Sequence, residues 1–416
     1  MIAPTSETTI HKFVLSNGVR VLVEPVGHVR SAAIGLWCKT GSRHELDHEA
    51  GVTHLIEHML FKGTDSRSAK QIAEEIEGKG GMLNAFTDKE QTCYYCRVLS
   101  DDALNGFDVL ADMMTHSLIA PDELAREAGV VVEEIKRSED EPSDHVHELH
   151  LQGRWGDHPL GKPIIGTRES VSGFRRDDLT AYMARRYRGE NIVLAVAGQV
   201  DPNVMRTAAE TILGGIEHGV EDAPLTRPAG LASRNELKKD VEQVHFCIGS
   251  DGVSLYDDDL YTMGVLDGVL GSGMSSRLFQ EIREKRGLVY AIGSYSLSYT
   301  AGGAFTVYGG TSPTTWSEVH DLVIADLKRL TSEGVPDDEL ERTKKNICGH
   351  MVLALEGMSA RMMRMARNEL NFQRDIPIEE SIAKVQAVSS EQIQALAERL
   401  FADELVSTTA IGPFAS

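Results

Sequence analysis

The feature that most constrains the fold is a repetition of short sequence signals between the two halves of the chain. Ser66-Arg67 in the first half corresponds to Ser276-Arg277 in the second, and Pro121-Asp-Glu-Leu corresponds to Pro336-Asp-Asp-Glu-Leu. Self-similarity over so long a distance indicates two similar domains. The length agrees, because half of 416 residues is sufficient for one hydrophobic core.

The domain boundary is predicted from a stretch rich in glycine, proline and charged residues at 216–236. We therefore expect one domain at 1–215, this linker, and a second domain at 237–416. Strand and helix signals occur in both halves without regular alternation, and Asn17-Gly18 between two apolar runs predicts a β-hairpin. The expected fold class is α+β, with a mostly antiparallel sheet and packed helices in each domain.

Two histidines in the segment from Gly51 to Phe61 lie four residues apart, at His54 and His58, with Glu57 between them. On a helix, positions i and i+4 lie on one face, so both imidazoles can reach a single metal ion. A lone histidine among the surrounding aliphatic residues would more often be structural. Burial of two histidines and a carboxylate there is costly unless a partner such as a metal offsets it. The trio therefore indicates a metal site with an adjacent proton acceptor.

The candidates for a third ligand lie on a helix predicted to begin at Pro121, where a proline and two acidic residues form a typical first turn. The carboxylates of this helix include Glu127, Glu133 and Glu134. Glu127 and Glu134 are seven residues apart and share a face, whereas Glu133 is rotated by about 100° from Glu134. Solvated surface glutamates are the alternative, although the aliphatic residues around Glu134 argue against a fully solvated face there.

The order His54-x-x-Glu57-His58 is the H-x-x-E-H pattern of inverzincins. Over nearly its whole length the chain resembles the pitrilysin and insulinase type of zinc peptidase, and most of all the two-domain branch that includes the mitochondrial processing peptidase. Besides the H-x-x-E-H helix, three segments carry the resemblance: Phe61-Lys-Gly-Thr64, Gly80-Gly-Met-Leu-Asn84-Ala-Phe-Thr87 and Val132-Glu-Glu-Ile135. Glu134 follows His58 by 76 positions, which agrees with the spacing in the family.

The resemblance implies that His54, His58 and Glu134 bind one zinc ion per chain, with Glu133 as the alternative ligand if the helix phase differs. It also implies Glu57 as general base on a zinc-bound water. Glu127 is implied as a carboxylate that orients a ligand imidazole, and its alternative role is that of a surface glutamate. The donor set suits this chemistry, because catalytic zinc keeps three protein ligands and leaves a fourth position for water.

The second half carries Arg283 and Tyr290 in a stretch that begins at Gly271. By pattern alone they are a helix-face cation and a strand aromatic, whereas the resemblance implies an arginine that anchors substrate and a tyrosine that donates to the oxyanion. The segment from Gly264 to Met274, which corresponds to the metal helix, has no histidine or glutamate. The second domain is therefore expected to lack zinc ligands, to supply substrate contacts and to enclose a peptide cleft with the first.

A strand that contains Asn84 and Ala85 resembles the edge strand on which related enzymes bind an extended peptide by backbone pairing. Such backbone pairing depends on the shape of the peptide more than on its sequence. The expected substrates are therefore unfolded peptides or targeting presequences, bound in part by Asn84 and Ala85.

The formal net charge is −21, from 42 basic and 63 acidic residues. Phosphate binding needs a basic surface, so nucleic acid is not an expected partner. An acidic surplus that lined the substrate site would favour basic peptides. The simpler interpretation, which we favour, is that the surplus serves solubility.

The five cysteines are few and odd in number, which indicates a reducing compartment. Cys93 and Cys96 have C-x-x-C spacing, but residues three apart in a strand point to opposite faces, so both are predicted to lie in cores. Four histidines lack the spacing of a helical pair and are expected in surface or interdomain packing: His145, His147, His150 and His158.

The first ten residues show no signal- or transit-peptide pattern, and the chain has no apolar run of about 18 residues or more. A cytoplasmic protein that does not cross a membrane is expected.

Two functions from different classes are compatible with the sequence. One is a zinc endopeptidase, expected to be a homodimer as the resemblance implies, and the other is a non-catalytic scaffold or partner subunit of the same family. Because the chain retains the zinc ligands and the base, the endopeptidase is the prediction.

Overall fold

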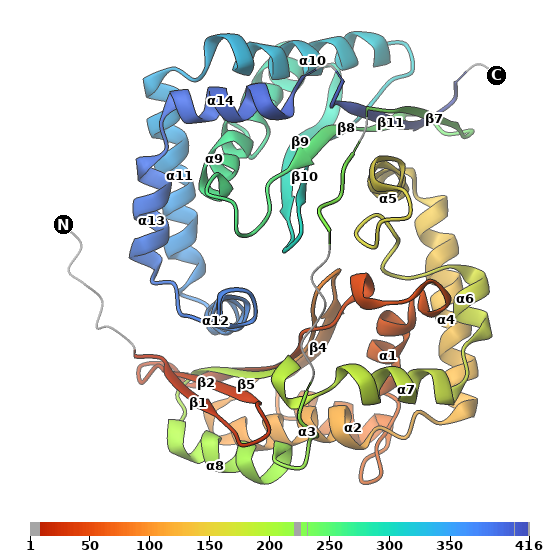
Figure 1. Ribbon diagram of the computed structural model, residues 1–416, viewed down its shortest axis with the longest axis vertical. Coiled ribbons are helices and arrows are strands. Elements are labelled where there is room, and N and C mark those ends of the chain that lie inside the picture. The colour runs from red at the N-terminus through yellow and green to blue at the C-terminus, as the bar shows by residue number, and fades with distance from the viewer. Residues whose placement is uncertain (1–8, 220–225, 231, 403, 415–416) are drawn as a thin grey trace. The chain divides into compact units, whose positions relative to one another are not determined.

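The computed structural model describes residues 9–219, 226–230, 232–402 and 404–414, and the chain divides into two compact units (Figure 1). The first unit contains residues up to 135 together with 163–223 and 354–375. The second contains 136–162, 224–353 and the residues from 376 onward. Each unit has one sheet with helices packed on it, so the expected α+β class with two similar domains is confirmed.

The sheet of the first unit has six strands in the order β1-β2-β6-β3-β5-β4. Its strands are β1 (His11–Val14), β2 (Arg20–Pro25), β3 (Ser31–Cys38), β4 (Met82–Thr87), β5 (Thr92–Leu99) and β6 (Ile192–Gly198). Neighbouring strands are antiparallel except for the parallel pair β2 and β6. The predicted hairpin joins β1 to β2, and Gly18 in its turn has a φ of 90°, which a glycine adopts without strain.

Helices from the first half of the chain cover one face of this sheet. They are α1 (Val52–Leu60), α2 (Ala69–Glu77), α3 (Ala103–His116), α4 (Pro121–Asp140), α6 (Arg168–Gly173), α7 (Arg176–Arg186) and α8 (Pro202–Leu213). Alternate strand residues such as Ile34 and Tyr94 pack with Leu55 of α1 and Phe107 of α3 in one buried cluster. This packing fixes α1 against the sheet.

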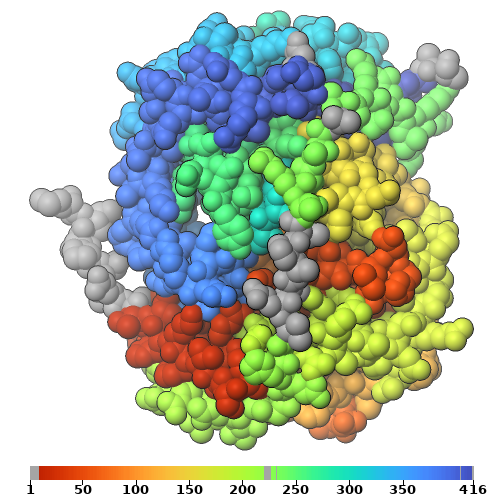
Figure 2. Space-filling model, in the orientation of Figure 1, coloured from red at the N-terminus to blue at the C-terminus, as the bar shows by residue number. Residues whose placement is uncertain are grey.

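The other face of the first sheet is covered by α12 (Met358–Phe372), a helix from late in the chain. Met362 lies against Trp37, whose indole N–H donates to the methionine sulfur at 3.4 Å. Figure 2 shows α12, in blue, beside the red hairpin of β1 and β2, and Lys12 of β1 pairs with Glu369 of α12 at 2.7 Å. Full burial of a side chain such as Met362 contributes about 1.5–3 kcal/mol.

The sheet of the second unit has five strands in the order β7-β11-β8-β10-β9. Its strands are β7 (Arg234–Lys238), β8 (Val244–Gly252), β9 (Val289–Ser298), β10 (Gly303–Thr311) and β11 (Ser407–Gly412). The helices are α5 (Pro142–Trp155), α9 (Leu260–Leu270), α10 (Trp316–Glu333), α11 (Asp337–Ala354), α13 (Ile378–Ala387) and α14 (Ser390–Leu400), with a π-helical turn η5 (Phe279–Glu284).

Helix α5 covers one face of the second sheet, although it precedes that sheet by about 80 residues along the chain. Val146 packs against Cys247 and Ile411, and Arg154 pairs with Asp251 at 3.0 Å. Two of the four histidines noted in the sequence contact the same sheet. His147 lies 2.8 Å from the Tyr295 hydroxyl, and His150 is buried 3.2 Å from the Thr409 hydroxyl.

The two units depart from the predicted linear boundaries at two segments. Residues 136–162 pack with the second unit and 354–375 with the first, and β7 begins inside the predicted linker at 216–236. Each sheet has two apolar faces, and the second face is covered by a helix from the other half of the chain. Composition indicates where a linker lies along the chain. It does not show which sheet is covered by a helix that is distant in sequence.

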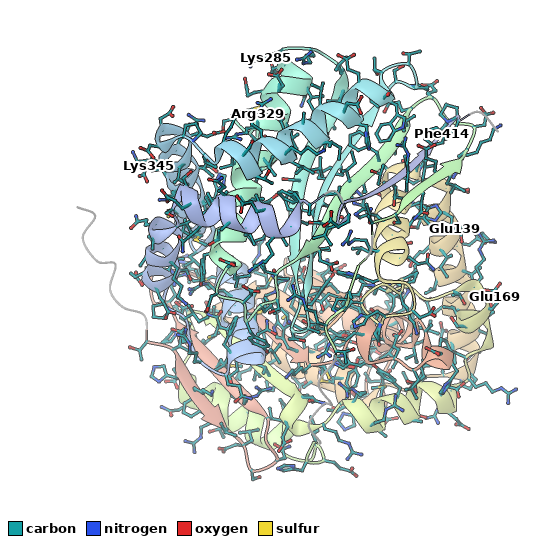
Figure 3. The ribbon with its side chains drawn as sticks, turned by 45° about the horizontal axis from the view of Figure 1, so that its top comes forward. Glu139, Glu169, Lys285, Arg329, Lys345 and Phe414 are labelled. Carbon is teal, nitrogen blue, oxygen red and sulfur yellow. The ribbon has the colours of Figure 1, made fainter. Side chains whose placement is uncertain are left out.

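Cys93 and Cys96 lie in buried clusters on opposite faces of the first sheet, as predicted, and all five cysteines are free. Charged side chains such as Glu169, Lys285 and Lys345 point into solvent (Figure 3). Among the described residues, no helix combines the length and the apolarity that a bilayer-spanning segment requires.

Candidate active site

The helix that carries the H-x-x-E-H pattern follows a glycine N-cap, and a carboxylate a few residues earlier in the chain accepts from its first amides. Gly51 has a φ of 89°, and a Cβ at this position would lie 2.5 Å from the carbonyl oxygen of Ile165. Glu45 accepts hydrogen bonds from the backbone amides of Gly51 at 2.8 Å and Thr53 at 2.9 Å, which satisfies donors that a helix start leaves unpaired. Burial raises the pKa of Glu45 to about 7, against the effect of these amides.

His54 and His58 lie on one face of α1 with their ring centroids 4.7 Å apart. Glu134 of α4 approaches both rings, with its Oε2 atom 3.9 Å from Nε2 of His54 and 3.7 Å from Nε2 of His58. One ligand atom from each of the three residues lies within 4.8 Å of the others. The structure therefore brings together the three residues that the resemblance implied, and Glu133 lies on the exposed side of α4.

This donor set fits a zinc ion. Tetrahedral zinc about 2.1 Å from each donor places the donors about 3.4 Å apart, close to the distances between Glu134 and the two imidazoles. Two nitrogens and one carboxylate oxygen are the donors of many catalytic zinc sites. Burial, helped by the neighbouring His58, lowers the pKa of His54 to about 4, so its ring is neutral and able to bind metal near pH 7.

Glu127 supports the site from the same face of α4 as Glu134. Its Oε2 atom lies 3.2 Å from Nδ1 of His58, and its Oε1 atom pairs with Lys62 at 2.7 Å. Only 7% of Glu127 is exposed, so a surface role is excluded. The carboxylate thus holds the outer nitrogen of His58 while Lys62 balances its charge.

We expect Glu127→Gln to weaken zinc binding by about 10- to 100-fold, because an amide holds the imidazole less strongly than a carboxylate does. Competition with a chromophoric chelator measures the affinity. The matched control is Glu123→Gln, one helical turn earlier, whose carboxylate pairs with exposed Arg126 instead. Equal affinities in the two variants would contradict the role of Glu127.

Glu57 points from α1 toward the end of β4. Its Oε2 atom accepts a hydrogen bond from the Thr87 hydroxyl at 2.5 Å. Burial raises the pKa of the Glu57 carboxyl, while Thr87 and His58 oppose the rise. A carboxylate with a raised pKa is suited to accept a proton and then to release it.

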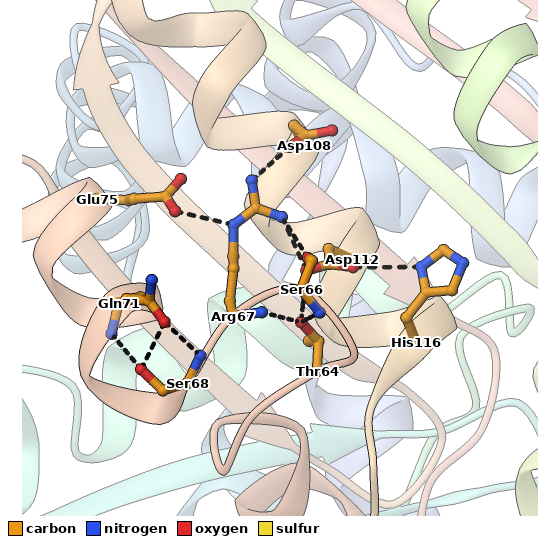
Figure 4. A network of polar contacts seen from close by, with 9 residues as sticks. All are labelled: Thr64, Ser66, Arg67, Ser68, Gln71, Glu75, Asp108, Asp112 and His116. Atoms are coloured by element: carbon orange, nitrogen blue, oxygen red, sulfur yellow. Dashed lines mark hydrogen bonds and ion pairs between the residues drawn. The ribbon is translucent and has the colours of Figure 1, made fainter.

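The loop that follows α1 is tied to α3 by a polar network centred on Arg67 (Figure 4). Arg67 forms ion pairs with Glu75 at 3.0 Å, Asp108 at 2.6 Å and Asp112 at 2.8 Å. Asp112 also accepts from the Thr64 hydroxyl at 2.7 Å. Burial alone would raise the pKa of Asp112, but these hydrogen bonds lower it, so the network is stable as ion pairs. The loop from Thr64 to Arg67 is thereby anchored to α2 and α3.

Asn84 and Ala85 lie on β4, an end strand of the first sheet, which within the described part of the chain pairs with β5 alone. The other edge of β4 therefore has backbone groups without a neighbouring strand of this sheet. Asn84 is exposed, and its side-chain oxygen accepts from the amide of Ala85 at 2.8 Å. The geometry is that of an edge strand to which a further strand can be added.

Arg283 and Tyr290 lie together in the second unit. The Arg283 guanidinium is 5.5 Å from the Tyr290 ring centroid and 4.7 Å from that of Phe279. Tyr290 is 80% exposed on β9, itself the last strand of its sheet. Among the described residues, no side chain of α9 belongs to a group that could hold a metal ion.

Sequence reasoning missed three residues around the site: Glu45, Lys62 and Thr87. Lys62 lies just beyond the end of α1, and its pairing with Glu127 of α4 joins residues far apart in sequence. Thr87 lies in the segment expected to bind peptide through its backbone, and the sequence does not show that its side chain reaches Glu57. Glu45 precedes the helix by several residues, and only the path of the intervening chain brings its carboxylate back to the helix start.

Comparisons with known proteins agree with this geometry. Residues 20–168 match the family model described as insulinase (peptidase family M16), and residues 173–347 match the peptidase M16 inactive domain. The uncharacterized zinc protease YmxG of Bacillus subtilis is 40% identical over 395 residues, which cover 95% of this chain and 96% of the relative. The uncharacterized zinc protease SCO5738 of Streptomyces coelicolor is 38% identical over 416 residues, covering 97% and 90%.

A solved structure is similar in fold. A protease from Helicobacter pylori has a TM-score of 0.91 at 21% identity, covering 98% of this chain and 100% of that chain. Because the relatives are well over 30% identical along nearly their whole length, and two family models match successive parts of the sequence, this chain belongs to peptidase family M16, the insulinase family.

Proposed function

We propose that this member of the family is a zinc-dependent endopeptidase that hydrolyses unfolded peptides or presequences. The observation that carries the proposal is the convergence of His54, His58 and Glu134 beside the carboxylate of Glu57. A metal-binding trio alone would serve structure equally well. The carboxylate one residue from a metal-binding imidazole adds the proton acceptor that hydrolysis requires.

Zinc held by His54, His58 and Glu134 would acidify a coordinated water and polarise the carbonyl under attack. Glu57 accepts the proton of the attacking water and then returns it to the leaving amine. The raised pKa of Glu57 favours the first transfer, because it makes the carboxylate a stronger acceptor for the proton of water. Glu127 keeps the His58 ring oriented through both steps.

The free edge of β4 supports the proposed substrate class. An extended peptide can pair with backbone groups at Asn84 and Ala85 and add a strand to the sheet, which folded proteins cannot do without opening. We propose that Arg283 anchors a substrate carbonyl or carboxylate and that Tyr290 donates to the oxyanion. The exposure of Tyr290 supports its availability for substrate.

The proposal extends to assembly and location. Family resemblance supports a homodimer, and five free cysteines support a reducing compartment such as the cytoplasm. Sedimentation of the purified chain at micromolar concentration tests the dimer directly. A species with the mass of one chain would remove it.

The test of the function combines metal analysis with cleavage of a quenched peptide library. The wild type is expected to contain about one zinc per chain, to lose activity on chelation and to regain it when zinc is restored. Unfolded peptides should be cleaved in preference to the same sequences held in a stable fold. A chain that binds zinc but cleaves no peptide would favour the scaffold instead.

A further inference from the structure

Thr87 contacts the carboxylate of Glu57 from the strand that is proposed to bind substrate. It is the last residue of β4, and its hydroxyl donates to Oε2 of Glu57 at 2.5 Å. Among the described residues, no other hydrogen bond to this carboxylate is found. The strand position of Thr87 is itself fixed, because Thr87 pairs with Thr92 of β5 on the opposite side from the free edge.

We propose that Thr87 is a positioning residue for the general base Glu57. The Thr87 hydroxyl holds Oε2 of Glu57 and so leaves Oε1 turned toward the attacking water, whose proton Glu57 accepts. The inference rests on the proposed function of the site and adds a residue to it. It also joins the two parts of that site, since one strand then carries both the peptide-pairing edge and the group that orients the base.

The physical reason lies in the freedom of a glutamate side chain. Glutamate has several rotatable bonds, and ordering it costs entropy that a single strong contact can compensate. A hydrogen bond to a charged acceptor is stronger than one between neutral groups, and Glu57 is largely shielded from water that could replace it. Without the hydroxyl, the carboxylate can rotate among orientations, and only some present an oxygen to the substrate.

A purely structural role for the contact makes different predictions. If Thr87 only joined α1 to β4, its loss would reduce stability, and kcat would follow the folded fraction. If Thr87 orients Glu57, its loss reduces kcat per folded, zinc-loaded chain while KM and zinc content stay nearly constant, whatever the change in melting temperature. Peptide pairing uses the backbone of β4, which a change of side chain leaves in place.

The experiment compares Thr87→Val, Thr87→Ser and Thr92→Val. Thr87→Val keeps the shape and removes the hydroxyl, and we expect kcat to fall by about 10- to 100-fold, as for loss of other orienting partners. Thr87→Ser restores the hydroxyl and should return kcat to within a few-fold of wild type. Thr92→Val is the matched control. It removes a buried hydroxyl that donates to the Thr40 carbonyl at 2.8 Å, so it should lower the melting temperature by about 2–4 °C and leave kcat unchanged.

Crystal structures supply a readout that is independent of activity. In Thr87→Val the Glu57 carboxylate should occupy more than one orientation, and in Thr87→Ser it should occupy the wild-type one. Unchanged kcat in Thr87→Val, or a loss that Thr87→Ser does not rescue, overturns the role of Thr87 while the peptidase stands. A wild type that cleaves nothing overturns the proposed function itself, and the inference falls with it.

Discussion

Glu57→Gln is expected to lower kcat by about 10²- to 10⁴-fold, the range that a positioned general base contributes. Glutamine preserves the length of the side chain and can still accept the hydrogen bond from Thr87. It cannot take a proton from water near neutral pH. The variant should therefore fold, bind zinc and bind peptide as the wild type does, and fail in the chemical step alone.

Three measurements separate this result from trivial loss of activity. Zinc content and melting temperature should match those of the wild type, and the inactive variant should bind a library peptide with an unchanged Kd. A variant that retains activity within tenfold would show that another group accepts the proton. A variant that loses zinc would show that Glu57 contributes to binding the metal instead.

The sequence was most informative where one local rule determines the result. The spacing of His54 and His58 requires a shared helix face, and Asn17-Gly18 requires a tight turn, so both features followed without knowledge of the rest of the chain. The opposite faces of Cys93 and Cys96 followed in the same way from the period of a strand. Such features depend on a few neighbouring residues.

The features that were missed depend on contacts between residues far apart in sequence. Met362 packs against Trp37 across 325 positions, and nothing in the amphipathic pattern of α12 identifies the sheet that it covers. The reach of Thr87 to Glu57 depends likewise on how β4 packs against α1. The pattern of apolar and polar residues shows that one face of a helix or strand is buried. Which element covers that face is determined by the packing of the whole chain.

The adjacent residues Glu133 and Glu134 illustrate both what a local rule predicts and what only the packing of the chain determines. Helix phase separates them by about 100°, and the sequence could not establish which face of α4 meets α1. In the structure Glu134 lies near both imidazoles, while Glu133 is exposed. These adjacent glutamates form a natural pair of test and control, since their substitutions change the same helix by the same chemistry.

Glu134→Gln is expected to weaken zinc binding by more than the roughly 10- to 100-fold caused by loss of an outer partner such as Glu127, because it removes an anionic donor from the ion itself. Glu133→Gln should leave zinc affinity and activity within a few-fold of wild type. Zinc binding also stabilises the folded chain, by about 2.7 kcal/mol at a hundredfold excess over Kd, so added zinc should raise the melting temperature of Glu133→Gln and not that of Glu134→Gln. The reverse pattern would make Glu133 the ligand. If both variants kept full affinity, neither glutamate would be a zinc ligand, and the site of His54, His58 and Glu134 with three protein ligands would be wrong.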